Sequence, residues 1–406
     1  MYIWWILYII DWGFFIPVAL TTAYIFIFSV LSLFPHNSHI VKSKHNRRFI
    51  VLIPSYKAGR LILETVNSVL GQTYSQRNFD IVVIADHQDE LVNMRLAQLP
   101  ITLLTPNFEH SSKLKSLQYA MLNLPQFKIY DAVILLNAGD IVEPEFLEQV
   151  NDAYESSGTK VIQTHRLARN RNVPIARLDS VFEEINNSIF RSGHLALGLS
   201  SALCNSGCVF DYLWFKQSIL KMRAFIGEDK EIEALLMREG IYVDFFADIH
   251  VYDVKASKIR EFNDRRSRWT YIQLHSLFNH IRQLPSAIFG GRYDQADKII
   301  QWMLVPRTTM MGIISIMAFV LPFIYFSLAI KWWIVAAVAI MSFAFATPNY
   351  LIDKHWNADF LRAPLISIGC LFSIFRAGKD AAGNRISAFG ELIKKIKAKI
   401  KSKIKK

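Results

Sequence analysis

The feature that most constrains this chain is the position of its long uncharged apolar runs, which lie near both ends. Residues 13–34 form one run, and residues 308–330 and 332–352 form two more that only Lys331 separates. About 20 apolar residues are enough to cross a bilayer as a helix, so each run has the required length. The sequence therefore predicts three membrane spans on either side of a middle part that carries most of the charge.

Basic residues beside the first run predict the orientation. They are Lys42, Lys44, Arg47 and Arg48, with no acidic residue among them. By the positive-inside rule this side faces the cytoplasm and the N-terminus lies outside. Residues 1–10 are also apolar, but Asp11 separates them from the run, and no basic n-region or cleavage site indicates a removable signal peptide. We expect an integral protein of the cell (inner) membrane whose middle part is cytoplasmic.

The C-terminal part predicts further contact with lipid. The apolar run at 363–375 is too short to span a bilayer and favours a re-entrant or interfacial segment. The tail ends ELIKKIKAKIKSKIKK, with isoleucines at helical spacing between lysines. This pattern is typical of a basic helix on an anionic leaflet, and the alternative is a disordered lysine tail. Nucleic acid is not an expected partner, because the net charge of +12 is largely juxtamembrane and no recognised binding motif accompanies it.

The middle part alternates short apolar runs with helical patterns. Strands are expected at 49–53, 79–85, 101–104, 132–136 and from Val161, and helices at 62–70 and 113–122. Such alternation predicts an α/β domain with a mostly parallel, Rossmann-like sheet, in which ligands bind at the carboxyl ends of strands. The predicted divisions are an anchor and basic linker (1–47), a catalytic domain (48–275), an amphipathic connector (276–307), a helical hairpin (308–352) and an interfacial segment with the tail (353–406).

Motifs at the expected strand ends resemble those of family 2 glycosyltransferases. Residues 53–57 read IPSYK, which resembles the turn where the family's first strand receives the nucleotide. The resemblance implies nucleotide-sugar contacts at Pro54 and Tyr56. Asp86 follows the second strand, where relatives place the aspartate that holds the base or ribose. A carboxylate there can accept two hydrogen bonds, and the alternative is a solvated turn aspartate.

The strand expected at 132–136 is followed by NAGD at 137–140, where relatives commonly carry Asp-x-Asp. In those relatives a carboxylate binds Mg²⁺ or Mn²⁺ that bridges the diphosphate, and such cations require oxygen ligands. The resemblance therefore assigns Asp140 to the donor and to the divalent cation. Lys113 opens a segment that resembles the family's Lys-x-x-Ala-Leu-Asn; it would neutralise phosphate charge, or lie at the surface.

Two further motifs resemble the acceptor side of the family's site. Asn205, Ser206 and Gly207 resemble the small-residue turn that lets the backbone approach the acceptor sugar. Glu228 and Asp229 resemble the Glu-Asp motif that supplies the general base, with Asp229 at the position of the base. Inverting transfer needs a carboxylate that takes the proton of the attacking hydroxyl. Acidic residues also favour a helix N-terminus, and both roles are compatible.

The last motif is RRSRW at 265–269, which matches Gln-x-x-Arg-Trp except that Arg265 stands at the position of Gln. Cellulose synthases, hyaluronan synthases and ceramide glucosyltransferases carry this motif, and the last accept Arg there. The resemblance assigns Arg268 to the diphosphate, which a guanidinium pairs with bidentately, and Trp269 to the donor or the acceptor sugar. The alternative is an interfacial Arg–Trp cluster beside the membrane.

Together the motifs imply a GT-A fold and an inverting, hexosyltransferase-type enzyme at the cytoplasmic membrane face. The expected donor is a nucleotide sugar, specifically a UDP-sugar, and the expected acceptor is a polysaccharide or a lipid-linked glycan. A divalent cation is the expected cofactor, and membrane lipids and polysaccharide assembly proteins are expected partners. The Gln-x-x-Arg-Trp resemblance favours polymer synthesis, whereas only two spans after the domain favour single transfer. The altered metal motif motivates a rival hypothesis, a non-catalytic subunit of an assembly complex.

Overall fold

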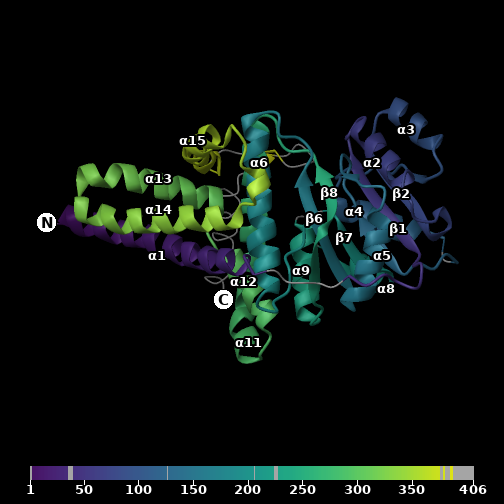
Figure 1. The fold of residues 1–406 in the computed structure, drawn as a ribbon, viewed down its shortest axis with the longest axis horizontal. Coiled ribbons are helices and arrows are strands. Elements are labelled where there is room, and N and C mark those ends of the chain that lie inside the picture. The colour runs from purple at the N-terminus through teal and green to yellow at the C-terminus, as the bar shows by residue number, and fades with distance from the viewer. Residues whose placement is uncertain are drawn as a thin grey trace, which may run out of the picture.

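Eight strands form one mixed sheet in the middle of the chain (Figure 1). They are β1 (Phe49–Tyr56), β2 (Phe79–Asp86), β3 (Thr102–Leu104), β4 (Ala132–Leu135), β5 (Ile141–Val142), β6 (Val161–Ala168), β7 (Cys208–Asp211) and β8 (Val243–Asp253). Their spatial order is β3-β2-β1-β4-β7-β6-β8-β5. β1 pairs in parallel with β2 and β4, β2 with β3, and β6 with β8, whereas β5 and β7 are antiparallel to their neighbours. The predicted mostly parallel, Rossmann-like sheet is confirmed.

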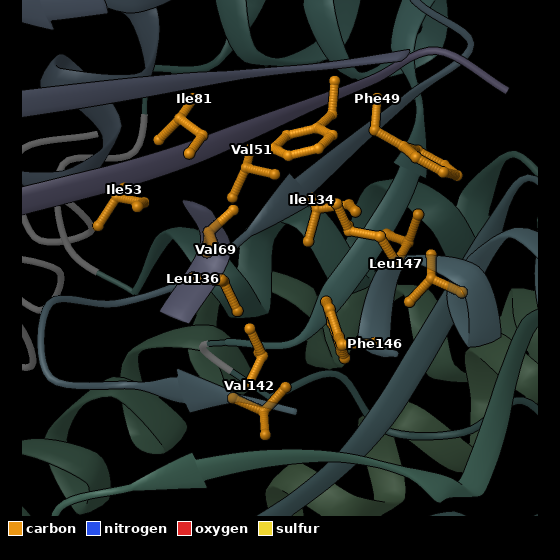
Figure 2. Packing of buried hydrophobic residues seen from close by; sticks show 14 of the residues in the cluster. Phe49, Val51, Ile53, Val69, Ile81, Ile134, Leu136, Val142, Phe146 and Leu147 are labelled. Atoms are coloured by element: carbon orange, nitrogen blue, oxygen red, sulfur yellow. The ribbon is translucent and has the colours of Figure 1, made fainter. Parts of the chain in front are cut away.

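Helices cover both faces of this sheet, and the alternation of β1 shows why both faces are apolar. Phe49, Val51 and Ile53 point into one core, which Figure 2 shows, and Ile50 and Leu52 point into the other. A strand buried on both faces appears in sequence as a continuous apolar run. Helices α2 (Leu61–Leu70), α3 (Glu90–Ala97) and α5 (Phe146–Ser157) cover the first core, and α4 (Lys113–Asn123), α8 (Tyr212–Lys221) and α9 (Glu228–Arg238) cover the second.

This computed structural model describes most of the chain but not all of it. The described residues are 2–34, 40–125, 127–204, 206–223, 227–374, 378–379 and 385–386. The last two segments pair as β9 (Gly378–Lys379) and β10 (Arg385–Ile386). The predicted basic tail helix and Asn205 lie outside the described residues.

Four long helices form a bundle beside the α/β domain. They are α1 (Tyr2–Leu31), α13 (Arg307–Ile324), α14 (Phe326–Ala346) and α15 (Trp356–Ile374). In the described part of the chain, three segments are long and apolar enough to span a membrane, namely Tyr8–Leu31, Arg307–Ile324 and Phe326–Ala346. Figure 1 shows α1, α13 and α14 side by side, with α6 (Pro174–Asn187) between them and the sheet. Residues 363–374 of the last apolar run belong to α15, which packs against α13.

Two of the predicted helix boundaries are wrong, and one contact explains both. Asp11 does not interrupt the first apolar segment, because α1 runs through it, and Lys331 lies inside α14 rather than between two helices. The break between α13 and α14 is at Tyr325. Asp11 Oδ2 pairs with Lys331, and its Oδ1 accepts a hydrogen bond from Trp332 Nε1 at 2.7 Å. The two charges neutralise each other between α1 and α14, so neither needs to lie at a helix end.

Shorter elements join the sheet to the bundle. After α6 the chain continues through a π-helical turn (Ser188–Ser192) and α7 (Gly193–Leu195). After β8 come α10 (Ile259–His280), α11 (Leu284–Phe289) and α12 (Tyr293–Met303). α10 crosses position 275 without a break and packs against α9, α12 and α15. α10 thus links α9 of the α/β domain to α15 of the bundle, which places the start of α9 and the middle of α10 at the junction.

Candidate functional site

The carboxyl ends of β1 and β2 bring the first two predicted donor-binding motifs together. Tyr56 is the register partner of Asp86, with Pro54 two positions earlier in the same strand. The Asp86 side chain is buried, and its Oδ1 lies 2.6 Å from Nδ1 of His87 and 3.5 Å from the backbone N–H of Phe108. Asp86 Oδ2 is buried with no hydrogen-bond partner in the described part of the chain. One acceptor oxygen is therefore unused at the strand end where the motif resemblance predicted base or ribose contact.

Asp140 lies after β4 and is also buried, at 1 % exposure. Its Oδ2 accepts a hydrogen bond from the backbone N–H of Asn137 at 2.7 Å and another from the Ser206 hydroxyl, and its Oδ1 has no partner among the described residues. Burial, reinforced by the Asp253 carboxylate, raises the pKa of Asp140 from 3.8 to about 6. Asp140 Oδ2 therefore stabilises its own loop, whereas Oδ1 is available to a ligand.

The described residues contain no group of three or more His, Cys, Asp or Glu side chains that could hold a metal ion. The described residues therefore do not form a metal site in which most ligands are protein side chains. Mg²⁺, however, is commonly held by one or two carboxylates together with substrate phosphates and water. The free Oδ1 of Asp140 fits that kind of shared site.

The small-residue turn predicted to meet the acceptor lies behind Asp140. Ser206 is buried with its hydroxyl on Asp140. Gly207 has a φ of +67°, and an added Cβ would collide with Thr164 and Val251. Only glycine fits this left-handed, closely packed position. In this structure Ser206 and Gly207 support the Asp140 loop rather than line the open cavity described next.

A cavity of about 520 Å³ opens at the junction between sheet and bundle, and five predicted site residues line it: Lys113, Glu228, Asp229, Arg268 and Trp269. Lys113 Nζ lies 3.3 Å from Asn137 Oδ1, after β4, and 3.9 Å from Asp229 Oδ1, at the start of α9. One lysine thus connects the strand end that carries the altered metal motif with the carboxylate of the predicted base. Pro54, Tyr56, Asp86 and Asp140 are not among the lining residues.

The first turn of α9 holds the two acidic residues at the cavity. Gly227 precedes them with a φ of +74°, and a Cβ there would lie 2.6 Å from Ile272 of α10, so α9 and α10 meet closely at this point. Acidic side chains in a first turn interact favourably with the helix dipole. Burial and the neighbouring Asp229 carboxylate raise the pKa of Glu228, while Lys113 and Arg268 act in the opposite direction. Glu228 therefore holds its proton more tightly than an exposed glutamate does, and Asp229 lies beside Lys113.

The residues of the RRSRW motif lie in α10, and not all of them face the cavity. Arg268 and Trp269 line the cavity, and so does Arg266, which had no predicted role. Arg266 pairs with Asp179 at 2.5 Å and stands over the Trp269 ring at 5.1 Å. Arg265, which stands at the Gln position of the motif, pairs with Glu261 at 2.6 Å instead.

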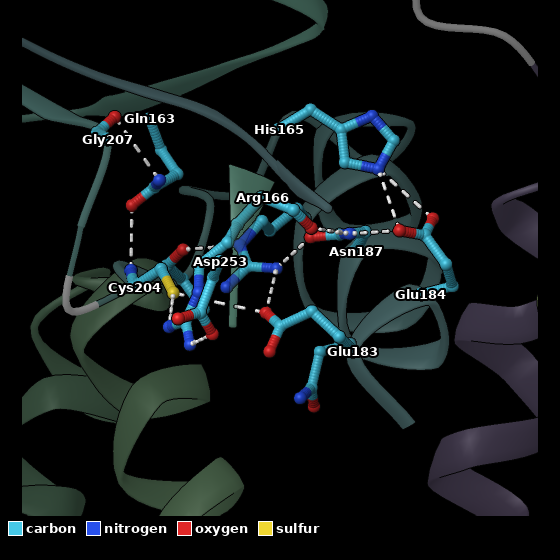
Figure 3. A network of polar contacts seen from close by, with 12 residues as sticks. Gln163, His165, Arg166, Glu183, Glu184, Asn187, Cys204, Gly207 and Asp253 are labelled. Atoms are coloured by element: carbon cyan, nitrogen blue, oxygen red, sulfur yellow. Dashed lines mark hydrogen bonds and ion pairs between the residues drawn. The ribbon is translucent and has the colours of Figure 1, made fainter. Parts of the chain in front are cut away.

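A buried charge network outside the predicted site residues lies beside the cavity (Figure 3), and its members Arg166 and Glu183 line the cavity. Arg166 pairs with Asp253, and Lys255 lies 3.1 Å from Asp253 and 3.3 Å from Glu183. Burial alone would raise the pKa of Asp253, but Arg166 and Lys255 lower it. The network joins β6, β8 and α6, segments too far apart in sequence for any spacing to reveal it.

At its other end the cavity reaches the bundle. Ile25 of α1, Arg307 and Thr308 of α13, and Phe182 and Phe190 near the end of α6 are among its lining residues. One cavity thus has acidic residues of the α/β domain at one end and the first residues of an apolar helix at the other.

Comparison with known proteins identifies the family. A model of the glycosyl transferase family group 2 matches residues 132–348, just over half of the chain. Among solved structures, the mannosyltransferase PcManGT from Pyrobaculum calidifontis, determined with GDP-Man and Mn²⁺, matches with a TM-score of 0.53 and 14% identity. The match covers 88% of this chain and 97% of that one, and it shows a shared GT-A fold.

S. aureus TarS (residues 1–349), alone and with UDP-GlcNAc, matches at 16% identity with TM-scores of 0.41 and 0.39, covering 80% of this chain and 89% of that one. No curated protein matches the sequence. The extent of the family match decides the assignment. The chain is a member of glycosyl transferase family group 2, a glycosyltransferase with a GT-A fold.

Proposed function

We propose that this enzyme transfers a sugar from a nucleotide-sugar donor to a membrane-associated acceptor with inversion at the anomeric carbon. The observation that carries the proposal is the position of Lys113, which lies within 4 Å of both Asn137 after β4 and Asp229 in the cavity. Relatives use the first of these positions for the donor diphosphate and the second for the base. A lysine between them is suited to hold the diphosphate where the base can serve the acceptor.

On the donor side, Asp86 receives the base or ribose beside Pro54 and Tyr56, and Arg268 and Lys113 face the diphosphate. A UDP-sugar is the first expectation, and GDP-mannose is the second because PcManGT was solved with GDP-Man. A divalent cation shared between Asp140 Oδ1 and the donor phosphates would neutralise charge on the leaving diphosphate.

In the transfer step, an acceptor hydroxyl oxygen attacks the anomeric carbon on the face opposite the diphosphate. Its bond to that carbon forms while the bond from carbon to the diphosphate oxygen breaks, and the electron pair leaves with the nucleoside diphosphate. Asp229 takes the hydroxyl proton. Glu228, the neighbouring residue in the first turn of α9, is the second acidic side chain that faces the acceptor. Trp269 provides an aromatic face for the acceptor or donor sugar.

We further propose that Tyr8–Leu31, Arg307–Ile324 and Phe326–Ala346 cross the cell membrane with the N-terminus outside. The proposal rests on their length and apolarity and on the basic residues that follow α1. The α/β domain then lies at the cytoplasmic face, where nucleotide sugars are made, and its acceptor enters from the bundle side.

The test is release of nucleoside diphosphate by detergent-purified full-length protein, with a panel of UDP-sugars and GDP-mannose in Mg²⁺ or Mn²⁺. We expect one donor to support release that needs the cation and Asp229. Glu90→Gln, in the first turn of α3 away from the cavity, is the matched control and should leave release unchanged. Nucleotide binding without turnover of any donor, with membrane extracts supplied as acceptor, would instead favour the non-catalytic subunit.

A further inference from the structure

The bundle end of the cavity contains an arginine with no acidic partner. Arg307, the first residue of α13, donates a hydrogen bond to the Phe182 carbonyl at 3.3 Å and another to Asn186 Oδ1. No carboxylate of the described residues forms an ion pair with it, and its Nη1 is buried without a hydrogen-bond partner there. An uncompensated charge of this kind is costly to bury, and a bound anion would remove the cost.

The surroundings of Arg307 make it the cation that an incoming anion would meet. Arg266 and Arg307 both stand over the Phe182 ring, at 5.1 and 5.9 Å from its centroid. The charge of Arg266 is met by Asp179, and Arg191, on the same cavity, lies 3.7 Å from Glu183. Three guanidinium groups therefore line this end, and Arg307 alone among them forms no ion pair with a carboxylate of the described residues; Glu183 acts on it only at longer range.

Apolar side chains also line this end, and they lie in or next to the helices that we propose to cross the membrane. Ile25 belongs to α1, Phe190 follows α6, and Val305 and Pro306 lead into α13. An occupant that fits has an anionic group for the guanidinium and a hydrocarbon part for α1 and α13. A planar guanidinium suits phosphate in particular, because it can donate two parallel hydrogen bonds to it.

We infer that the acceptor is a membrane lipid whose phosphate binds Arg307 and whose hydroxylated headgroup extends along the cavity to Asp229. This inference rests on the proposed function, which it narrows from any membrane-associated acceptor to a phospholipid-type one. It also separates the roles of the two cavity ends: the bundle end selects the lipid phosphate, and the α9 end carries out the transfer.

The experiment measures binding of didecanoyl phosphatidylglycerol and of neutral didecanoylglycerol to full-length protein in detergent, by thermophoresis. We expect the phosphate lipid to bind more tightly, and Arg307→Gln to weaken that binding about tenfold without changing the affinity for the neutral lipid. Arg307→Lys, which keeps the charge, should fall between the two. Arg362→Gln is the matched control, because Arg362 is an exposed arginine of α15 outside the cavity.

Nucleotide affinity, measured on the same variants, shows that they remain folded. The inference is overturned if both lipids bind equally, if Arg307→Gln and Arg362→Gln behave alike, or if inorganic phosphate displaces the lipid as effectively as the lipid displaces itself. It is also overturned if phosphatidylglycerol binds through Arg307 but neither receives sugar nor inhibits transfer, since it is then a structural lipid. Donor hydrolysis with lipid binding indifferent to Arg307 leaves the proposed function standing and overturns the inference alone. Arg307-dependent lipid binding without turnover of any donor overturns the proposed function and, with it, the acceptor role of the lipid.

Discussion

The donor side and the acceptor side of the proposed site hold their carboxylates in opposite ways. Asp86 ends β2 and Asp140 follows β4. Both side chains are 1 % exposed, and in each one carboxylate oxygen bonds to the surrounding loop while the other has no partner among the described residues. Glu228 and Asp229 lie in the first turn of a helix and face an open cavity. The sheet thus fixes the donor side in advance, while the acceptor side is assembled from helices that also contact the bundle. Changes on the two sides should therefore have separable effects.

The largest effect is expected from Asp229→Asn. Loss of the base should lower the rate of transfer by about a thousandfold, since general bases contribute roughly 10² to 10⁴. The dissociation constant of the nucleotide should change little, because Asp86 and the other donor contacts are untouched. Product formation and nucleotide titration, run on the same preparation, measure both. Equal losses in transfer and in nucleotide affinity would erase the distinction between the two sides.

The next effect concerns stability and pH on the donor side. Because burial raises the pKa of Asp140 from 3.8 to about 6, the folded state binds the proton more tightly than the unfolded state. The free energy of unfolding should therefore fall as pH rises from about 4 to about 6, by roughly 3 kcal/mol, and level off above. Asp140→Asn removes this contribution. Thermal unfolding midpoints of both proteins across this range are the measurement, and parallel pH profiles would contradict the raised pKa.

A smaller effect is expected from Asp86→Asn. The variant keeps one acceptor oxygen but loses the charge and one free acceptor, so nucleotide affinity should fall about tenfold. Asp89→Asn is the control, since Asp89 caps α3 by accepting from the Leu91 N–H and lies three residues away. Isothermal titration with nucleoside diphosphate separates the two variants. Similar affinities for both would mean that Asp86 does not contact the nucleotide.

The smallest effect is expected from Trp269→Ala. Trp269 is 38% exposed and its ring is shared with Arg266, so part of its interaction is already made without ligand. We expect the KM for acceptor to rise about threefold with kcat little changed. Steady-state kinetics with varied acceptor measure this. A fall in kcat alone would place Trp269 with the chemistry of transfer instead of acceptor binding.

Local patterns predicted strands β1 to β4 and β6, because their signals are local, whereas β5, β7 and β8 were not predicted. Phe49 to Ile53 and Ala132 to Leu136 are buried on both faces, so their continuous apolar runs identified strands, and the polar residues after them identified the binding edge. The expectation that Glu228 and Asp229 favour a helix N-terminus agrees with α9, which begins at Glu228 directly after Gly227.

Contacts between distant segments could not be predicted in the same way. In the sequence, Asp11 and Lys331 each resemble the boundary of a membrane helix. Only their pairing explains why both lie inside helices. The Arg166–Asp253 pair joins β6 to β8, and Arg307 meets the cavity only because α13 begins beside α6. Each of these contacts depends on tertiary packing, which the spacing of residues in a single sequence does not reveal. The roles of the donor and acceptor residues remain predictions until the variants above are measured.

The pairing of Asp11 with Lys331 also bears on how the protein is made. The two residues are separated by 320 positions, and a ribosome adds about 5 to 20 residues each second. If α1 enters the bilayer as it emerges, its aspartate stays without a counter-ion for tens of seconds, at a cost of a few kcal/mol in the membrane. On that condition, α1 reaches its final environment only when the hairpin of α13 and α14 arrives, and a chain that ends before the hairpin would leave the charge of Asp11 without its counter-ion.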